Sequence, residues 1–62
     1  MKLKTLLRQH TNRAETIRVY SFEDGRYILC YADIIDDLKD EFLGRSIQSW
    51  QIIYDVINVY LK

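Results

Sequence analysis

Two runs of alternating β-branched and aromatic residues flank a single Asp-Gly pair near the middle of the chain. The runs read TIRVYSF, residues 16–22, and RYILCYA, residues 26–32, with Asp24-Gly25 between them. Asp-Gly between two such runs is the strongest short-range signal for a β-hairpin, because a type I′ turn needs a positive φ at both central residues. The sequence therefore predicts a hairpin closed by a two-residue loop, and the rest of the fold must be built around it.

A two-residue loop also fixes which residues of the two runs face each other. Side chains alternate between the two faces of a hairpin, so each face takes every second residue. One face is predicted to be aromatic with an arginine, and the other to be small and aliphatic, which suits a covering helix. The aromatic face pairs Phe22–Tyr27, Tyr20–Leu29 and Arg18–Tyr31, and the aliphatic face pairs Ser21–Ile28, Val19–Cys30 and Ile17–Ala32. A three-residue loop would shift every pair by one residue, so that register stays open.

Helical spacing opens the chain, and a β-branched tail closes it. Leucines recur at intervals of three and four near the start, which predicts a short helix over about residues 2–10. Residues 46–61 are ambiguous, because one apolar stripe fits a helix whereas strict alternation and six β-branched residues favour two strands. The favoured interpretation is a second hairpin that turns near Tyr54-Asp55, where no glycine is present, and a single helix is the runner-up.

The segment DIIDDLKDEF, residues 33–42, holds five carboxylates in ten positions. At about 100° per residue, the apolar side chains Ile35, Leu38 and Phe42 fall on one side of a helix and the acids fall on the other. Gly44 follows where a helix C-cap is expected. The segment therefore predicts a short amphipathic helix that packs on the sheet.

The acids of this segment are also candidates for chemistry. A calcium loop is excluded because no glycine occupies its sixth position, and a general acid–base pair would need a cleft that an exposed helix does not offer. Asp33 or Asp36 is expected to be the N-cap. Asp40 and Glu41 lie further along, where the helix dipole does not explain them, and are candidate contacts for a basic partner.

Together these elements predict one α+β domain over residues 1–62, in the order helix, strand, strand, helix, strand, strand. We expect a mostly antiparallel four-stranded sheet with helices on one face, and the alternative is a β-hairpin with three helices. A chain this short buries only about 60% of its unfolded surface. Cys30 and His10 are the only cysteine and histidine, so neither an intrachain disulfide nor a cysteine-based zinc site can form. No metal or cofactor is expected, and tight packing or a homodimer is the expected source of extra stability.

The chain opens MKLKTLL, continues TIRVYSFEDGRYI and DIIDDLKDEFLGRSIQSW, and closes YDVINVYL. This series of motifs, which spans nearly the whole chain, resembles a group of short open reading frames carried by phages and prophages of Gram-positive bacteria. That group shares a Met-Lys-Leu-x-x-Leu-Leu opening, a hairpin with an acidic glycine-containing turn, a short acidic helix and a final hairpin. The last turn, YDV, is less acidic than in that group. The resemblance implies a small accessory protein of a mobile element, and it implies no enzyme, cofactor or site residue.

Basic residues gather in the first eighteen positions, against the single acid Glu15. Phosphate binding favours a cluster of this kind on one face beside aromatic residues. Nine basic and nine acidic side chains give a net charge of zero, which opposes strong electrostatic affinity. Nucleic-acid binding is therefore the alternative function. Its candidate residues are Lys2, Lys4, Arg8, Arg13 and Arg18.

Aromatic residues make up 13% of the chain, and most of those in the hairpin fall on one face. Two short helices can cover only one side of a four-stranded sheet, so we expect the aromatic face to remain open as a contact surface. The predicted partner-binding residues are Arg18, Tyr20, Phe22, Tyr27, Tyr31, Asp40 and Glu41. The first functional hypothesis is a non-enzymatic protein-interaction module that binds a host or viral protein.

The sequence carries no apolar run near the roughly 20 residues of a membrane span, and its first residues lack the apolar core of a signal peptide. We therefore expect a cytoplasmic protein without membrane contact, and the resemblance to phage and prophage reading frames implies that its cell is a bacterial host. Cys30 is expected to be buried in mid-strand and inert. No nucleophile elbow, phosphate loop or dinucleotide fingerprint is present, which argues against an enzyme.

Overall fold

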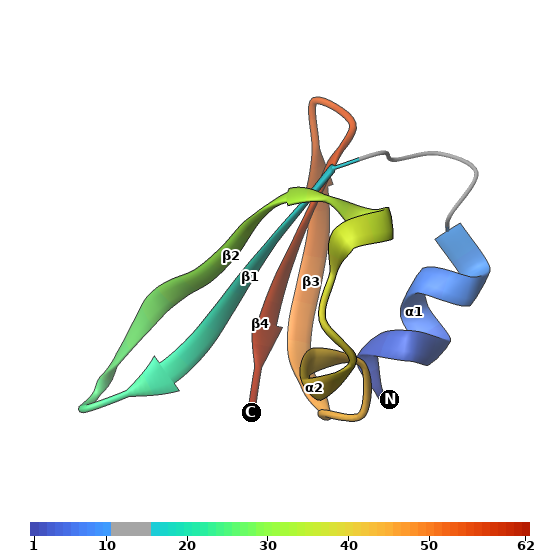
Figure 1. The fold of residues 1–62 in the computed structure, drawn as a ribbon. Coiled ribbons are helices and arrows are strands. Elements are labelled where there is room, and N and C mark those ends of the chain that lie inside the picture. The colour runs from blue at the N-terminus through green and yellow to red at the C-terminus, as the bar shows by residue number, and fades with distance from the viewer. Residues whose placement is uncertain (11–15) are drawn as a thin grey trace.

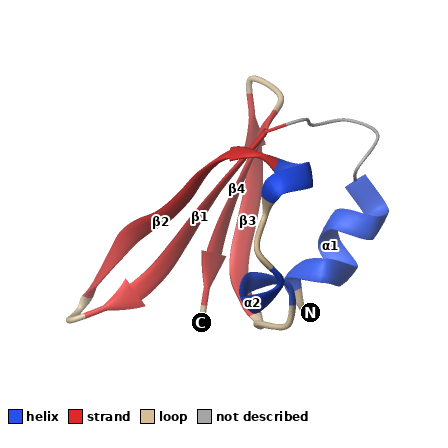
Figure 2. Cartoon of the chain, in the orientation of Figure 1, coloured by secondary structure: helices blue, strands red, loops and turns tan. Residues whose placement is uncertain are grey.

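The computed structural model describes residues 1–10 and 16–62, and it has two layers (Figures 1 and 2). In chain order the elements are α1 (Leu3–His10), β1 (Thr16–Glu23), β2 (Arg26–Ile34), the 3-10 helix η1 (Ile35–Asp37), α2 (Asp40–Leu43), β3 (Ile47–Ile53) and β4 (Val56–Leu61). The strands form one sheet in the order β2-β1-β4-β3, and both helices lie on the same side of it (Figure 1). The predicted α+β class is confirmed.

The sheet is mixed, because its two hairpins meet through a parallel pair at the centre. β1 pairs antiparallel with β2, and β3 pairs antiparallel with β4. β1 and β4 run parallel, with Ile17 beside Ile57 and Val19 beside Val59. The expectation of a mostly antiparallel sheet therefore misses this central pair, which joins segments far apart in the sequence.

Both hairpins close through two residues with positive φ, as type I′ turns require. In the first turn these residues are Asp24 (φ 52°) and Gly25 (φ 81°), as the sequence predicts. In the second they are Tyr54 (φ 50°) and Asp55 (φ 65°), so this turn forms without glycine. The tail is thus a hairpin, and the runner-up interpretation of a single helix over residues 46–61 is wrong.

One extra residue in β2 shifts the pairing of the first hairpin. The predicted pairs are correct from the turn up to Tyr20–Leu29, but Val19 then pairs with Tyr31 instead of Cys30. Cys30 is the additional residue of a β-bulge, and every side chain beyond it changes face relative to the prediction. Cys30 is also exposed, so the expectation that it is buried is wrong.

The hydrophobic core lies between the helices and one face of the sheet. The leucines of α1 face the sheet at helical spacing, and alternate residues of the central strands meet them. The buried core consists of Leu3, Leu6, Leu7, Ile17, Val19, Leu38, Phe42, Ile47, Ile57, Val59 and Leu61. Because α1 has only eight residues, it is held by this packing rather than by its own propensity.

The acidic segment forms two short helical turns instead of the single helix predicted. Leu38 and Lys39 are extended between η1 and α2, with ψ angles of 131° and 145°. The break lets both Leu38 and Phe42 be buried, and it removes the like-charge i,i+4 contacts that a continuous helix would impose. Gly44 is the C-cap as predicted.

The predicted N-caps of that segment are wrong. Ile34 and Lys39 occupy the N-cap positions of η1 and α2, and neither makes a side-chain cap hydrogen bond. The Asp33 carboxylate accepts a hydrogen bond of 2.8 Å from the backbone N–H of the next residue, at the end of β2. Asp33 therefore lies at the end of a strand instead of at the start of a helix.

Candidate interaction surface

One face of the sheet is left uncovered by the described helices, and we call it the open face. Each row across the sheet is fixed by the register of the three strand pairs. From one end to the other, the rows are Ile34–Thr16–Val56–Ile53, Ala32–Arg18–Asn58–Gln51, Leu29–Tyr20–Tyr60–Ser49 and Tyr27–Phe22. Arg18 is the only charged residue at these positions, so the open face is largely apolar with one cation.

Four aromatic side chains form a connected cluster at one end of the open face. Tyr20 and Tyr60 stack across the parallel pair, with ring centroids 4.9 Å apart and planes inclined by 14°. The Tyr27 ring meets that of Tyr60 edge-on at 5.2 Å, and it meets Phe22 edge-on at the same distance. Such pairs contribute about 0.5–1.5 kcal/mol each beyond their buried area. We call these four residues the aromatic cluster.

The cluster divides into an inner pair and an outer pair. Tyr20 and Tyr60, on the central strands, are half-buried by each other and by their neighbours. Phe22 is 54% exposed and Tyr27 is 40% exposed, and Leu29 beside them is also exposed. The inner pair is explained by packing within the sheet, whereas the outer pair leaves apolar area that the described chain does not cover.

Tyr60 was not among the residues predicted from the sequence. The alternation of INVYLK placed it with Asn58 and Lys62, opposite the core residues of that strand. The alternation could not show which residue lies beside Tyr60 on the adjacent strand, because no local signal predicts the parallel pairing of β4 with β1. With that pairing known, Tyr60 falls beside Tyr20.

Tyr31 lies on the covered side of the sheet, contrary to the predicted register. The bulge at Cys30 turns its ring toward Phe42, with centroids 6.4 Å apart, and its hydroxyl donates a 2.7 Å hydrogen bond to the Ile34 carbonyl oxygen. Desolvation raises the pKa of Tyr31 above its usual value, and the carboxylates of Asp33 and Asp37 raise it further. Tyr31 is therefore part of the packing between sheet and helices, not of the open face.

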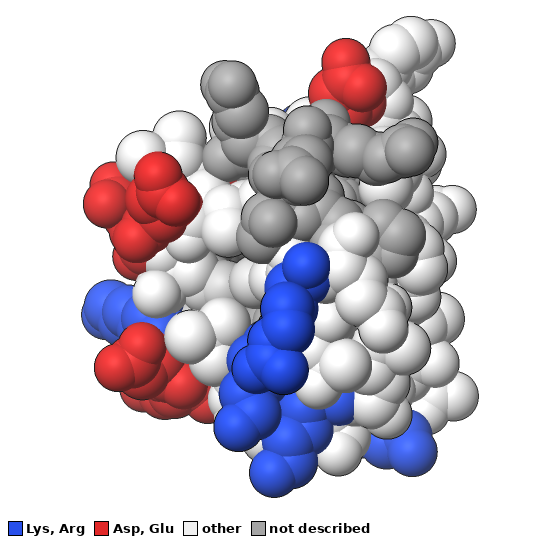
Figure 3. Space-filling view, turned by 90° about the vertical axis from the view of Figure 1, so that its right-hand side faces the viewer, with Lys and Arg blue, Asp and Glu red and all other residues white. Residues whose placement is uncertain are grey.

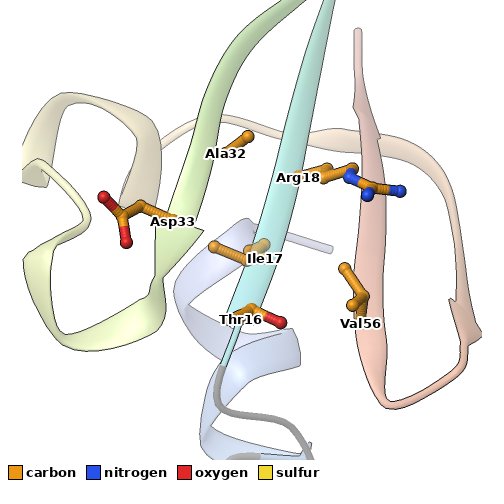
Figure 4. Close-up of a pocket in the computed structure, with 6 residues that line it drawn as sticks. All are labelled: Thr16, Ile17, Arg18, Ala32, Asp33 and Val56. Atoms are coloured by element: carbon orange, nitrogen blue, oxygen red, sulfur yellow. The ribbon is translucent and has the colours of Figure 1, made fainter.

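A shallow hollow of about 330 Å³ lies at the other end of β1 from the aromatic cluster. Its lining residues are Thr16, Ile17, Arg18, Ala32, Asp33 and Val56 (Figure 4). The guanidinium of Arg18 extends toward β4, whereas the Asp33 carboxylate points away from it (Figure 4). Arg18 therefore presents its charge to the open face rather than to this acid.

The basic residues predicted to bind nucleic acid are divided between the two sides of the molecule. Lys2, Lys4 and Arg8 are exposed on α1 or directly before it, on the helical side. Figure 3 shows that side, with basic side chains in a band and acidic side chains gathered next to it. Arg18 lies on the open face, and Arg13 is outside the described residues. The geometry thus separates Lys2, Lys4 and Arg8 from the aromatic cluster, and leaves Arg18 on the same face as that cluster.

Asp40 and Glu41 are exposed in the first turn of α2. Because the acidic segment is broken at Leu38–Lys39, these two carboxylates begin a helical turn rather than continue one. Acids at that position are favoured by the helix dipole, by about 0.3–1 kcal/mol at most in so short a helix. Their acidity therefore has a local explanation that the sequence interpretation did not find.

Within residues 1–10 and 16–62, no group of three or more histidine, cysteine, aspartate or glutamate side chains is placed to hold a metal ion. Among the helices described, none is long and apolar enough to cross a bilayer.

Comparison with known protein families, with curated proteins and with solved structures found no match to this chain. The open face and its aromatic cluster therefore carry the functional argument, together with the order of motifs along the sequence.

Proposed function

We propose that the chain is a non-enzymatic protein-interaction module that binds a protein partner through the open face. The observation that carries the proposal is the exposed outer pair of the aromatic cluster, Phe22 and Tyr27, beside exposed Leu29 and on the same face as the cation Arg18. Aromatic residues and arginine are the types most enriched where binding energy concentrates in protein interfaces. A partner with apolar side chains and a carboxylate would satisfy both parts of this surface.

The order of motifs along the sequence also suggests the biological origin and the cellular location of the chain. Its resemblance to short phage and prophage reading frames favours an accessory protein of a mobile element, which acts in the cytoplasm of a bacterial host cell. The partner is then a host or viral protein.

The test is capture of partners from a host lysate by the wild-type chain and by two matched variants. Phe22→Ser/Tyr27→Ser removes the exposed rings and keeps the inner pair, so the sheet retains its central stack. Tyr54→Ser removes an aromatic side chain that is 95% exposed at the other hairpin turn, and serves as the control. We expect the double variant to lose the captured protein and the control to keep it. Retention of every partner by the double variant would refute the proposal.

The same preparation separates this function from the nucleic-acid alternative. Binding to single-stranded oligonucleotides that strengthens steeply as salt falls, and that weakens in Arg8→Ala and Arg18→Ala, would favour the alternative. We expect no such binding, because Arg8 and Arg18 lie on opposite sides of the sheet.

A further inference from the structure

The outer edge of β2 is unpaired among the described residues. β2 is the outermost strand, and no strand among the described residues pairs with its outer side (Figure 1). Between Arg26 and Asp33 it reads YILCYA, with neither charge nor proline, and most of these residues are exposed. Natural sheets protect such edges with lysine, proline, short strands or β-bulges, because an open edge is a template for pairing with another chain. Between Arg26 and Asp33, the bulge at Cys30 is the one such device in β2.

The opposite edge is treated differently. The start of β3 is already in contact with the chain's first residues: Lys2 forms a bridge with Ser46, and the Ile47 N–H donates a 2.9 Å hydrogen bond to the Met1 carbonyl oxygen. Of the six residues of β3 that follow Ile47, three are polar: Gln48, Ser49 and Gln51. Strand addition is therefore favoured at β2.

β2 is complementary to itself in charge. Arg26 and Asp33 lie at equal distances from the point between Leu29 and Cys30, close to the middle of β2. In an antiparallel pair of two β2 strands centred there, each Arg26 lies opposite Asp33 of a second copy. The twofold symmetry of such a pair forms this ion pair twice.

The bulge at Cys30 also lets paired side chains of the two β2 strands lie on the same face in this register. Because Cys30 adds one residue, Tyr27 and Ala32 both lie on the open side, and Ile28 and Tyr31 both lie on the covered side. The register pairs Tyr27 with Ala32 and Ile28 with Tyr31 of the second copy, so each pair lies on one face. In a strand without a bulge, this register would set every side chain against one of the opposite face.

We propose that two copies of the chain associate through antiparallel pairing of their β2 strands, with Arg26 of each copy against Asp33 of the other, to form a continuous eight-stranded sheet. A face-to-face dimer through the open faces would bring two Arg18 side chains together, and no acid occupies a paired position of that face. Edge pairing leaves both open faces free and joins them into one surface. The proposal does not rest on the proposed function.

Sedimentation of the full chain over a range of concentrations tests this with a charge-swap pair. Arg26→Asp alone and Asp33→Arg alone each set like charges against one another at both ends of the β2 pair. We expect each variant to raise the dimer dissociation constant at least about tenfold over that of the wild type. An equimolar mixture of the two restores opposite charges at both ends, and we expect heterodimers of near wild-type affinity.

Arg26 also faces Glu23 across the first turn, so its substitution could weaken the hairpin. The mixture controls for this, because a variant that failed to fold could not be rescued by the other one, and circular dichroism of each variant checks its fold. A wild-type chain that stays monomeric at all concentrations would overturn the proposal. Single variants that dimerise like the wild type, or a mixture that stays monomeric, would overturn the β2 register.

A cross-link supplies a second readout without any change of charge. In the proposed register Cys30 of each copy lies beside Leu29 of the other, next to the twofold axis, and its thiol is exposed. A short bismaleimide should therefore join two wild-type chains, but should leave Arg26→Asp uncoupled. Equal coupling of both proteins would contradict the register.

Discussion

At the scale of single residues, the bulge at Cys30 decides which side chains reach the open face. RYILCYA alternates acceptably with or without an extra residue, so nothing in the sequence marks where the pairing shifts. The bulge becomes favourable only in three dimensions, where it turns Tyr31 toward Phe42 on the covered side. The sequence therefore predicts the aromatic residues nearest the turn correctly and places Tyr31 on the wrong face.

The partial burial of Tyr31 and the nearby carboxylates lead us to expect a pH dependence of stability. Its pKa is raised above 10 in the folded chain, so folding favours the protonated phenol. The stabilisation is complete at pH values below 10 and is lost as the pH rises above 10 toward the folded pKa. We expect the free energy of unfolding of the wild type to fall more steeply above pH 10 than that of Tyr31→Phe, measured by urea unfolding. Equal slopes in the two proteins would contradict this.

The second turn predicts a stabilising substitution. Tyr54 and Asp55 both hold left-handed backbone, which costs an ordinary residue about 1–2 kcal/mol, and the Tyr54 side chain is almost fully exposed. Tyr54→Asn/Asp55→Gly should therefore raise the free energy of unfolding by about 1 kcal/mol, seen as a higher melting temperature.

The first turn offers a control of opposite sign. Gly25 has a φ of 81° and open space where a Cβ would lie, so Gly25→Ala should destabilise through the backbone alone. Unchanged melting of the Tyr54→Asn/Asp55→Gly variant would show that the second turn holds no strain.

At the scale of elements, the hairpins and the first helix follow from local signals, whereas the contacts between them do not. Alternation and the Asp-Gly turn predict β1 and β2, and leucine spacing predicts α1. The parallel pairing of β1 with β4 joins segments about 40 residues apart, and it depends on the shape of the whole core. The break between η1 and α2 likewise depends on burying Leu38 and Phe42 together.

Arg45 connects several elements through hydrogen bonds, so we expect its substitution to destabilise the fold. Its guanidinium donates hydrogen bonds to the Lys62 carbonyl oxygen at 3.1 Å and to the Ser21 hydroxyl at 3.4 Å, while its own carbonyl accepts from Leu3. Arg45→Ala should therefore lower the free energy of unfolding by about 1–2 kcal/mol, measured by urea unfolding. Lys4→Ala, at an exposed position of α1, should change it by less than about 0.5 kcal/mol. Equal effects of the two substitutions would show that the Arg45 contacts contribute nothing.

At the scale of the whole molecule, the core is one-sided. The described helices bury one face of the sheet and leave large apolar side chains such as Phe22, Tyr27 and Leu29 exposed on the other. The sequence predicts this asymmetry, because two short helices cannot cover both faces of four strands. The residues of the open face could not be identified without the strand register, which depends on the bulge in β2 and on the parallel pairing of β1 with β4.

The most direct test of the account is the accessibility of the open face to a soluble gadolinium chelate, measured by NMR on the wild-type chain. We predict strong relaxation enhancement at the side chains of Phe22, Tyr27 and Leu29, and weak enhancement at those of Val19 and Val59 in the core. Pairing through β2 leaves this prediction unchanged, because it covers an edge and not a face. Protection of Phe22 and Tyr27 equal to that of Val19 and Val59 would contradict the account, since the aromatic cluster would then already be covered.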